Sequence, residues 1–362
     1  MNNKYTAFLD WGLLTPVIVL VILGLTSLFS IQIDFFRNQL FFLIISLFVY
    51  FFFSQVDIET LKYYSLPIYV VSFFILLLLL FLGTEARGAV RWFTFFGVNI
   101  QLSEIVKPFL ALSFASFLTS SKKNLTTLVV SFVFLTPIMY LIYKQPDLGN
   151  ALLFLLVFFL TVFVYGFQLR YFVAGVFGLS IISPILWSFL KEYQRERFLT
   201  FLYPTKDPLG TSYNTIQAII AIGSGMFFGR GISQGTQSTL RFLPEKHTDF
   251  IFAKISEDLG FIGSVVILLA FIFLLYRIYT IFSKTENQFI KVFSLCSFFF
   301  LFTQSFINIG MNLGILPIVG VTLPFVSYGG SSLLSSFIFL GFLSSANRLQ
   351  KKAEVLEIGR RF

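Results

Sequence analysis

Residues 241–263 read R-F-L-P-E-K-H-T-D-F-I-F-A-K-I-S-E-D-L-G-F-I-G, and this stretch decides how the rest of the chain is interpreted. Its first half places four ionisable residues directly before a long apolar run: Glu245, Lys246, His247 and Asp249. Two more, Glu257 and Asp258, follow within the helix that the run predicts. Ionisable groups are costly near lipid, so they persist there in ion pairs or around a wet cavity with a function. The stretch therefore predicts an active site at a membrane surface, with Asp249 as its reactive carboxylate.

The composition is that of an integral membrane protein. Of the 362 residues, 57% are hydrophobic and only 12% are charged, whereas soluble domains carry about 25% charged residues. The single cysteine, Cys296, lies within an apolar run, which excludes a disulfide framework and a cysteine-based metal site. The pI near 9.5 is explained by basic loops at membrane surfaces, so nucleic-acid binding is not expected.

Apolar runs long enough to cross a hydrocarbon core of about 30 Å recur along the chain. The predicted spans are residues 13–30, 38–53, 66–82, 103–119, 126–143, 148–165, 171–190, 251–275, 289–313 and 331–346. The sequence thus predicts an all-α integral membrane protein with ten transmembrane helices, in which residues 1–362 form a single polytopic domain.

Lysine and arginine in short loops set the orientation, because they favour the cytoplasmic side. One set of loops and the tail hold Lys4, Lys62, Lys122, Lys123, Arg170, Arg277, Lys284, Lys291, Arg348, Lys351, Lys352, Arg360 and Arg361. The opposite short loops hold only Arg37, Arg87, Arg91 and Lys144. We therefore expect both termini to be cytoplasmic.

Two predicted outer segments are longer than tight turns, residues 83–102 and a long loop over about 191–250 before the eighth span. The middle of the long loop, residues 213–231, is typical of a half-span helix ended by glycines. Lipid tolerates such a helix only where it packs on protein or lines a cavity. Residues 314–332 are apolar but interrupted by proline and glycine, which predicts a re-entrant or kinked approach to the last helix.

Asp249 has two candidate roles. Taken alone, the Thr248–Asp249 pair is explained by a helix start, with Thr248 as the cap and Asp249 complementing the helix dipole. That explanation does not account for the ionisable residues before it, or for Glu257 eight residues later on roughly the same helix face. A carboxylate at a lipid–water boundary can have its pKa raised toward the working pH, which suits a general base. On these residues alone, both roles stay open.

Two further pairs of residues are candidates for a supporting role. Glu104 and Lys107 are three residues apart at the start of the fourth span, so they share a helix face and can pair. This pair either fixes helix packing or supports the site. Arg91 and Trp92 stand side by side in the first outer segment, where Trp92 is either an interfacial anchor or a wall of a sugar or phosphate site.

The long outer loop carries basic residues that could clamp a diphosphate, because guanidinium forks match phosphate oxygens. They are Arg195, Arg197, Arg230, Arg241 and Lys246. Attraction to anionic lipid headgroups is the simpler explanation for the same residues. His247, the only histidine, either hydrogen-bonds the backbone or takes part in the site.

Several of these stretches resemble the SEDS family (shape, elongation, division and sporulation). The matching residues are Asp10 and Trp11, R-W-F at 91–93, Q-L-S-E-I-V-K-P at 101–108, K-Q-P-D-L-G at 144–149, D-P-L-G-T-S-Y at 207–213, A-I-G-S-G at 221–225, residues 235–253, and P-F-V-S-Y-G-G-S-S at 324–332. The stretch G-T-Q-S at 235–238 favours the elongation branch over the division branch. Val90, Leu102 and Asp258 depart from the residues that the family usually has.

The resemblance implies a peptidoglycan glycosyltransferase with ten spans. Such an enzyme polymerises lipid II, an undecaprenyl-diphosphate-linked disaccharide peptide, at the outer face of the bacterial cytoplasmic membrane. The family's essential aspartate corresponds to Asp249, its outer tryptophan to Trp92, and its buried acid–base pair to Glu104 and Lys107. The implied partner is a class B penicillin-binding protein, which is a transpeptidase.

The chemistry of lipid II agrees with these residues. Its sugar is already attached to a good leaving group, a diphosphate, so the enzyme must orient an acceptor hydroxyl, remove its proton and neutralise the departing charge. Asp249 would be the base, and one displacement would invert the anomeric carbon. Basic loop residues or a divalent cation would neutralise the diphosphate, and no other cofactor is evident.

Two functions of other classes are also compatible with the sequence. A lipid II flippase would explain ten spans and broken helices, but it needs polar groups through the whole depth of the bilayer. Here the ionisable residues gather toward the predicted outer side. A scaffold for another synthase would tolerate any substitution of Asp249. A polymerase of the division branch is a third alternative.

Overall fold

The computed structural model describes residues 9–86, 89–95, 98–120, 122–190, 192–203, 212–239 and 242–361. Its helices are α1 (Trp11–Ile31), α2 (Ile33–Gln55), α3 (Ile58–Tyr63), α4 (Ser65–Leu82), α5 (Leu102–Ile105), α6 (Lys107–Thr119), α7 (Leu125–Lys144), α8 (Leu148–Tyr165), α9 (Leu169–Phe189), α10 (Glu192–Leu202), α11 (Tyr213–Ser224), α12 (Thr236–Thr239), α13 (Ile251–Lys284), α14 (Gln288–Asn312) and α15 (Gly330–Arg361). Three strands are also present: β1 (Thr84–Ala86), β2 (Ala89–Phe95) and β3 (Val98–Ile100).

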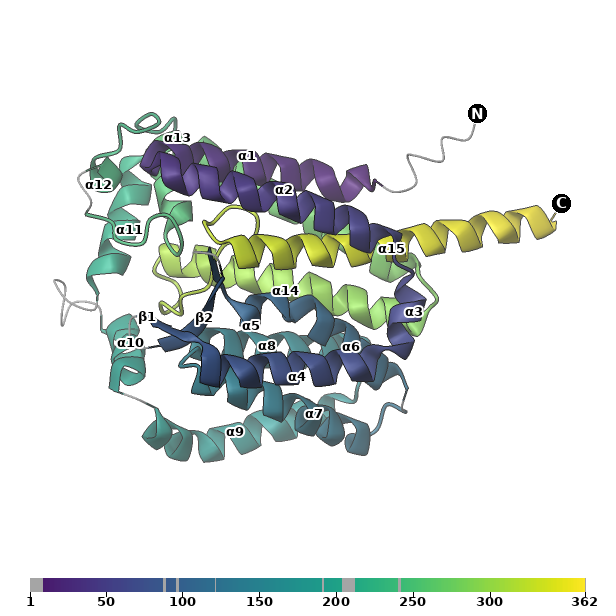
Figure 1. Cartoon of the computed structure of the whole chain (residues 1–362). Coiled ribbons are helices and arrows are strands. Elements are labelled where there is room, and N and C mark those ends of the chain that lie inside the picture. Colours follow the sequence, from purple (N-terminus) through teal and green to yellow (C-terminus); the bar gives the residue numbers. More distant parts are fainter. Residues whose placement is uncertain are drawn as a thin grey trace.

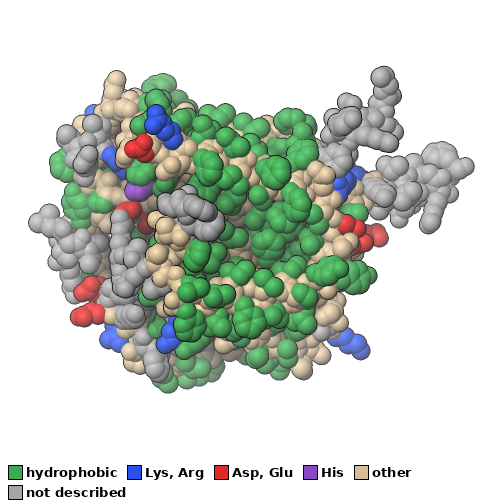
Figure 2. Space-filling model, in the orientation of Figure 1, with side chains coloured by type: hydrophobic (Ala, Val, Ile, Leu, Met, Phe, Trp, Pro, Cys, Tyr) green, Lys and Arg blue, Asp and Glu red, His purple; other side chains and the backbone are tan. Residues whose placement is uncertain are grey.

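The prediction of a helical membrane protein is confirmed. Among the described residues, eight helical segments are long and apolar enough to cross a membrane: α1, α2, α4, the combined α5 and α6, α7, α8, α13 and α14. They coincide with eight of the ten predicted spans, and the other two predicted spans fall on α9 and α15. In Figure 2, hydrophobic side chains cover the middle of the visible face, and the charged ones lie toward its two ends.

The long helices run side by side, with α14 at the centre of the bundle (Figure 1). α14 packs against α6, α8 and α13, and α15 packs along α2. α1 begins and α15 ends at the same end of the bundle. The strands and α10 to α12 gather at the opposite end, so the two segments predicted to be outer lie together.

The expectation of helices alone missed a small sheet at that end. The strands form an antiparallel sheet in the order β1-β2-β3, which occupies most of the segment 83–102. The strands are rich in valine, threonine and aromatic residues, which favour extended backbone. Strand pairing satisfies the backbone groups of this segment.

The predicted span 251–275 is not one continuous helix, because α13 breaks at Gly260. This residue has φ +67° and ψ −156°, a conformation that suits only glycine. The loop that follows α11 satisfies the interrupted backbone with four hydrogen bonds: Phe261 N–H to Met226 O at 2.9 Å, Ile262 N–H to Phe227 O at 3.3 Å, Arg230 N–H to Glu257 O at 2.9 Å and Gly231 N–H to Asp258 O at 3.0 Å. Residues 251–259 are therefore a short helix joined to the α11 loop, and residues 261–284 form the long helix.

A helix, α11, lies within the residues predicted to form a half-span helix, and it packs on α13 and α14. Two glycines at the C-terminal end of α11 differ in how closely they approach α13. A methyl group at Gly225 would overlap the carbonyl oxygen of Ser256, whereas one at Gly223 would meet nothing within 4 Å. Gly225→Ala is expected to destabilise the protein by about 1–3 kcal/mol, because the backbones must separate.

Gly223→Ala is the matched control, and it should be neutral or stabilising by up to about 1 kcal/mol, since alanine favours the helix. Thermal unfolding of the two purified variants in detergent compares them. Equal melting temperatures would contradict the close packing of α11 on α13.

Candidate active site

Asp249 lies just before α13, at the end of the bundle that carries the sheet. The helix begins at Ile251 after Phe250, which makes no side-chain cap, so Thr248 is not the capping residue. Its hydroxyl instead donates back to the carbonyl and the carboxylate of Glu245, both at 3.3 Å. Asp249 is partly exposed. The prediction that Thr248 caps this helix is therefore wrong.

The backbone around Asp249 is held by the chain that joins α14 to α15 and by α14 itself. The carbonyl groups of residues 247, 248 and 249 all accept hydrogen bonds from this region. The donors are Tyr328 N–H to His247 O at 2.8 Å, Ser327 Oγ to Thr248 O at 2.7 Å, and Asn308 and Asn312 Nδ2 to Asp249 O at 3.1 and 2.9 Å. A non-helical segment at the edge of a membrane domain is thus fixed at three consecutive residues.

His247 belongs to an aromatic cluster beside Asp249. Its ring stacks on Phe35 of α2, with centroids 4.4 Å apart and planes within 6°. Tyr328 lies next to both rings, and Glu245 Oε2 is 3.9 Å from His247 Nε2. Lys246 is half-buried in the same segment. The N-terminal end of α2 therefore forms one side of the candidate site, which the sequence did not reveal.

Glu257 does not share a helix face with Asp249, because Asp249 precedes the helix. Glu257 is fully buried, and its Oε1 accepts a hydrogen bond of 2.8 Å from the backbone N–H of Gln237 in α12. A side chain at Gly235 would collide with this carboxylate. Glu257 thus fastens α12 to α13 and lies away from the surface on which Asp249 is exposed.

Glu104 and Lys107 form the predicted ion pair. The distance from Lys107 Nζ to Glu104 Oε1 is 2.6 Å, and both residues are buried. Lys254 and Asp258 form a second buried ion pair in the short helix of α13. Both charges of each pair are thereby compensated inside a membrane domain.

A polar network joins the start of α8 to Gln101, which lies three residues before Glu104. Asp147 begins α8 and accepts hydrogen bonds from Asn150 N–H at 3.3 Å and from Asn150 Nδ2 at 2.9 Å. Gln101, which stands just before Glu104, donates to the same carboxylate at 2.9 Å. Asp147 therefore connects the start of α8 to the segment that leads into the ion pair.

Arg91 and Trp92 lie on β2, at the edge of this network. The guanidinium of Arg91 donates to the carbonyl oxygen of Gln145 at 3.2 Å and to that of Pro146. Trp92 is half-buried, and its carbonyl accepts a hydrogen bond of 3.0 Å from the Thr84 hydroxyl. Arg91 thus ties the sheet to the loop before α8.

The basic residues of the long loop are not gathered into a clamp where the structure describes them. Arg195 donates to the carbonyl groups of Trp187 and Ser188, at 3.1 and 2.7 Å, at the C-terminal end of α9. Arg230 donates to the carbonyl of Ser224 at 2.8 Å, at the end of α11. Both guanidinium groups thereby satisfy carbonyl groups at the C-terminal ends of helices. Arg241 and the side chain of Arg197 lie outside the described residues, so the clamp stays a prediction.

Residues 319 and 320 lie between Asp249 and the polar network. A methyl group at Gly149, in the first turn of α8, would collide with the carbonyl oxygen of Val319. One at Gly320 would lie 3.7 Å from Asp249 Oδ2. Asp249 and the start of α8, which carries Asp147, therefore both lie close to residues 319 and 320 in the connection between α14 and α15.

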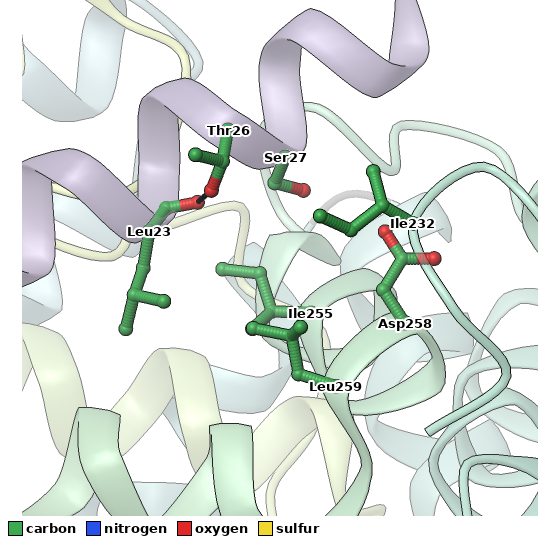
Figure 3. Close-up of a pocket in the computed structure, with 7 residues that line it drawn as sticks. All are labelled: Leu23, Thr26, Ser27, Ile232, Ile255, Asp258 and Leu259. Atoms are coloured by element: carbon green, nitrogen blue, oxygen red, sulfur yellow. Dashed lines mark hydrogen bonds between the residues drawn. The ribbon is translucent and has the colours of Figure 1, made fainter. Parts of the chain in front are cut away.

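A small pocket between α1 and α13 is not a substrate site. It is lined by Leu23, Thr26, Ser27, Ile232, Ile255, Asp258 and Leu259, and the Asp258 carboxylate points toward it (Figure 3). The space open to the centre of a water molecule is about 10 Å³, roughly the room that one water needs. A sugar cannot enter it.

Within the described ranges, no three His, Cys, Asp or Glu side chains form a group that could hold a metal ion. The divalent cation that the sequence left open thus stays a prediction. The residues that sequence reasoning missed are those that hold the site: Asn308, Asn312, Ser327 and Tyr328. Two asparagines one turn apart in a membrane span were the available signal, because polar groups there need partners.

Comparisons with known proteins agree on one family. The family model FTSW_RODA_SPOVE, described as "Cell cycle protein", matches residues 4–352. The peptidoglycan glycosyltransferase MrdB of Escherichia coli K12 is 39% identical over 290 residues, which cover 78% of each chain.

Two solved structures share the fold. One is a chain from a structure of a peptidoglycan synthase complex that coordinates polymerization and crosslinking. It is 31% identical, with a TM-score of 0.82, and the match covers 94% of this chain and 98% of that chain. The rod shape determining protein RodA of Thermus thermophilus is 27% identical with a TM-score of 0.70, covering 93% of this chain and 96% of its own. The chain therefore belongs to the SEDS family, the family of the cell cycle proteins FtsW, RodA and SpoVE.

Proposed function

We propose that the protein is a peptidoglycan glycosyltransferase that polymerises lipid II at the outer face of the bacterial cytoplasmic membrane. MrdB, which is similar over 78% of the chain, is named a peptidoglycan glycosyltransferase. The observation that carries the proposal for the site is Asp249: a partly exposed carboxylate on a segment whose backbone is fixed at three consecutive residues. Fixed geometry is what a base needs in order to meet a substrate proton.

The proposed reaction is one displacement at the anomeric carbon of the donor lipid II. Asp249 takes the proton of the acceptor hydroxyl as the hydroxyl oxygen attacks that carbon. The bond from the carbon to the diphosphate breaks, and the undecaprenyl diphosphate leaves with the electron pair. Attack opposite the leaving group inverts the carbon. Lys246, Arg197, Arg241 or a divalent cation would neutralise the diphosphate.

The proposed topology is a single polytopic domain with ten spans, in which α9 and α15 join the eight apolar segments. Both termini are placed in the cytoplasm. α1 begins and α15 ends at the same end of the bundle (Figure 1), which supports this arrangement. The basic residues of the short loops and the tail support the sidedness.

The proposed partner is a class B penicillin-binding protein with transpeptidase activity. The similar chain from a peptidoglycan synthase complex supports this, because that complex coordinates polymerization with crosslinking. The resemblance to RodA and MrdB supports a role in cell elongation and shape.

A polymerisation assay with pure protein tests the proposal against a lipid II flippase. We expect glycan polymer when lipid II is supplied in detergent, where both faces of the protein are accessible. A transporter catalyses no bond formation and would give none. Absence of polymer from folded protein, with the partner transpeptidase added as well as without it, would contradict the proposed reaction.

A further inference from the structure

Asn308 and Asn312 stand one turn apart on α14, and both reach the same atom. Each donates its Nδ2 hydrogen to the carbonyl oxygen of Asp249, at 3.1 and 2.9 Å. Both side chains are completely buried. A carbonyl oxygen has two lone pairs, so two converging donors fill its capacity and fix the direction of the C=O bond.

The same two side chains also hold the chain on either side of Asp249. Asn312 Oδ1 accepts a hydrogen bond of 3.0 Å from Ala253 N–H, in the first turn of α13. Asn308 Nδ2 donates to Val321 O at 2.7 Å, in the connection between α14 and α15. One pair of asparagines thus joins three segments at the point where the Asp249 carboxylate emerges.

We propose that Asn308 and Asn312 are positioning residues for Asp249, and that their amide donors set the direction of its side chain. The inference rests on the proposed role of Asp249 as the base. Both donors engage the backbone carbonyl and not the carboxylate. Because the side chain leaves the same Cα, rotation of this peptide group moves the carboxylate. A displacement of about 1 Å at a reacting group can lower the rate by about 100-fold.

The variant Asn312→Asp tests the hydrogen bond that Asn312 donates separately from the one that it accepts. The new side chain has nearly the same shape and can still accept from Ala253 N–H, but when ionised it cannot donate to Asp249 O. At a pH where the new carboxyl is ionised, we expect kcat for lipid II polymerisation to fall by about 10- to 100-fold with KM little changed. Thermal unfolding at that pH checks that a buried carboxylate without a cationic partner leaves the protein folded. Asn308→Asp should have the same effect, since its Nδ2 also donates to Asp249 O.

A pH profile distinguishes lost donation from general damage to the fold. A protonated carboxylic acid regains one O–H donor, so the activity of Asn312→Asp relative to wild type should rise as the pH is lowered. Asn312→Leu has a similar size but no donor at any pH, and its relative activity should stay low and flat. Asn124→Asp is the matched control, because this residue caps α7 through its acceptor Oδ1, which aspartate retains.

The two asparagines are not positioning residues if folded Asn308→Asp and Asn312→Asp polymerise at the wild-type rate at every pH tested, alkaline pH included. The proposal is equally overturned if their relative activity does not rise at low pH and tracks their thermal stability. The variant Asp249→Asn distinguishes a failure of the positioning role from a failure of the proposed function. If Asp249→Asn is inactive while both asparagine variants are normal, only the positioning role is lost.

Discussion

Asp249→Asn is expected to lower the rate of lipid II polymerisation by at least about 100-fold, because a base of this kind contributes about 100- to 10,000-fold. Asparagine has the same shape but cannot take a proton from the acceptor hydroxyl. Folding should be preserved, since the side chain is partly exposed and the bonds from Asn308 and Asn312 go to the backbone carbonyl. The measurement is the yield of glycan polymer from purified protein and lipid II in detergent.

Asp57→Asn is the matched control for that variant. Asp57 caps α3 at the opposite end of the bundle by accepting from Glu59 N–H at 3.0 Å, and asparagine caps as well as aspartate. We expect its polymer yield to equal that of wild type. Wild-type yield from Asp249→Asn itself would remove the catalytic role and would favour a scaffold.

Lys107→Met is expected to destabilise the protein by about 3–5 kcal/mol, because it leaves the Glu104 carboxylate buried without its partner. Glu104→Gln should destabilise for the same reason, since it leaves the Lys107 ammonium unpaired. The double variant Glu104→Gln/Lys107→Met removes both charges and should recover most of the lost stability. Thermal unfolding of the three proteins in detergent measures this. A double variant less stable than either single variant would contradict a compensated pair.

Polymerisation by the folded double variant then decides between the two roles considered for the pair. A wild-type rate means that the pair only fixes the packing of α5 and α6. A low rate in a stable protein means that the pair also supports the site.

The sequence predicted the spans well, because lipid imposes their length and excludes charge. It also predicted the pairing of Glu104 with Lys107, since three residues on a helix are a local distance. It could not predict the break of α13 at Gly260. The hydrogen bonds that permit the break come from residues 226–231, which are distant in sequence.

The hydrogen-bond acceptors of the arginines could not be predicted from the sequence, for a similar reason. Composition indicates that an arginine can bind phosphate, but which acceptor it meets depends on the nearest unsatisfied carbonyl groups. Arg195 and Arg230 lie at the C-terminal ends of α9 and α11, and their guanidinium groups bind there. The strands could not be predicted because β1 and β3 have three residues each and β2 has seven, too few for the alternation of apolar and polar residues to be clear.

The four bonds that close the break of α13 join main chain to main chain, and this has a consequence for how the loop can evolve. The carbonyl groups of Met226 and Phe227 accept two of these bonds, and Phe228 follows them in the loop. The side chains of these three residues are 75%, 56% and 79% exposed, respectively. These side chains therefore add no hydrogen bond to the joint, although the ring of Phe227 stacks on that of Phe261 across the break. Phe228 can change among apolar residues to suit the hydrocarbon or protein around it, whereas Met226, at φ +50°, disfavours β-branched replacements and the glycines that flank the joint cannot be replaced.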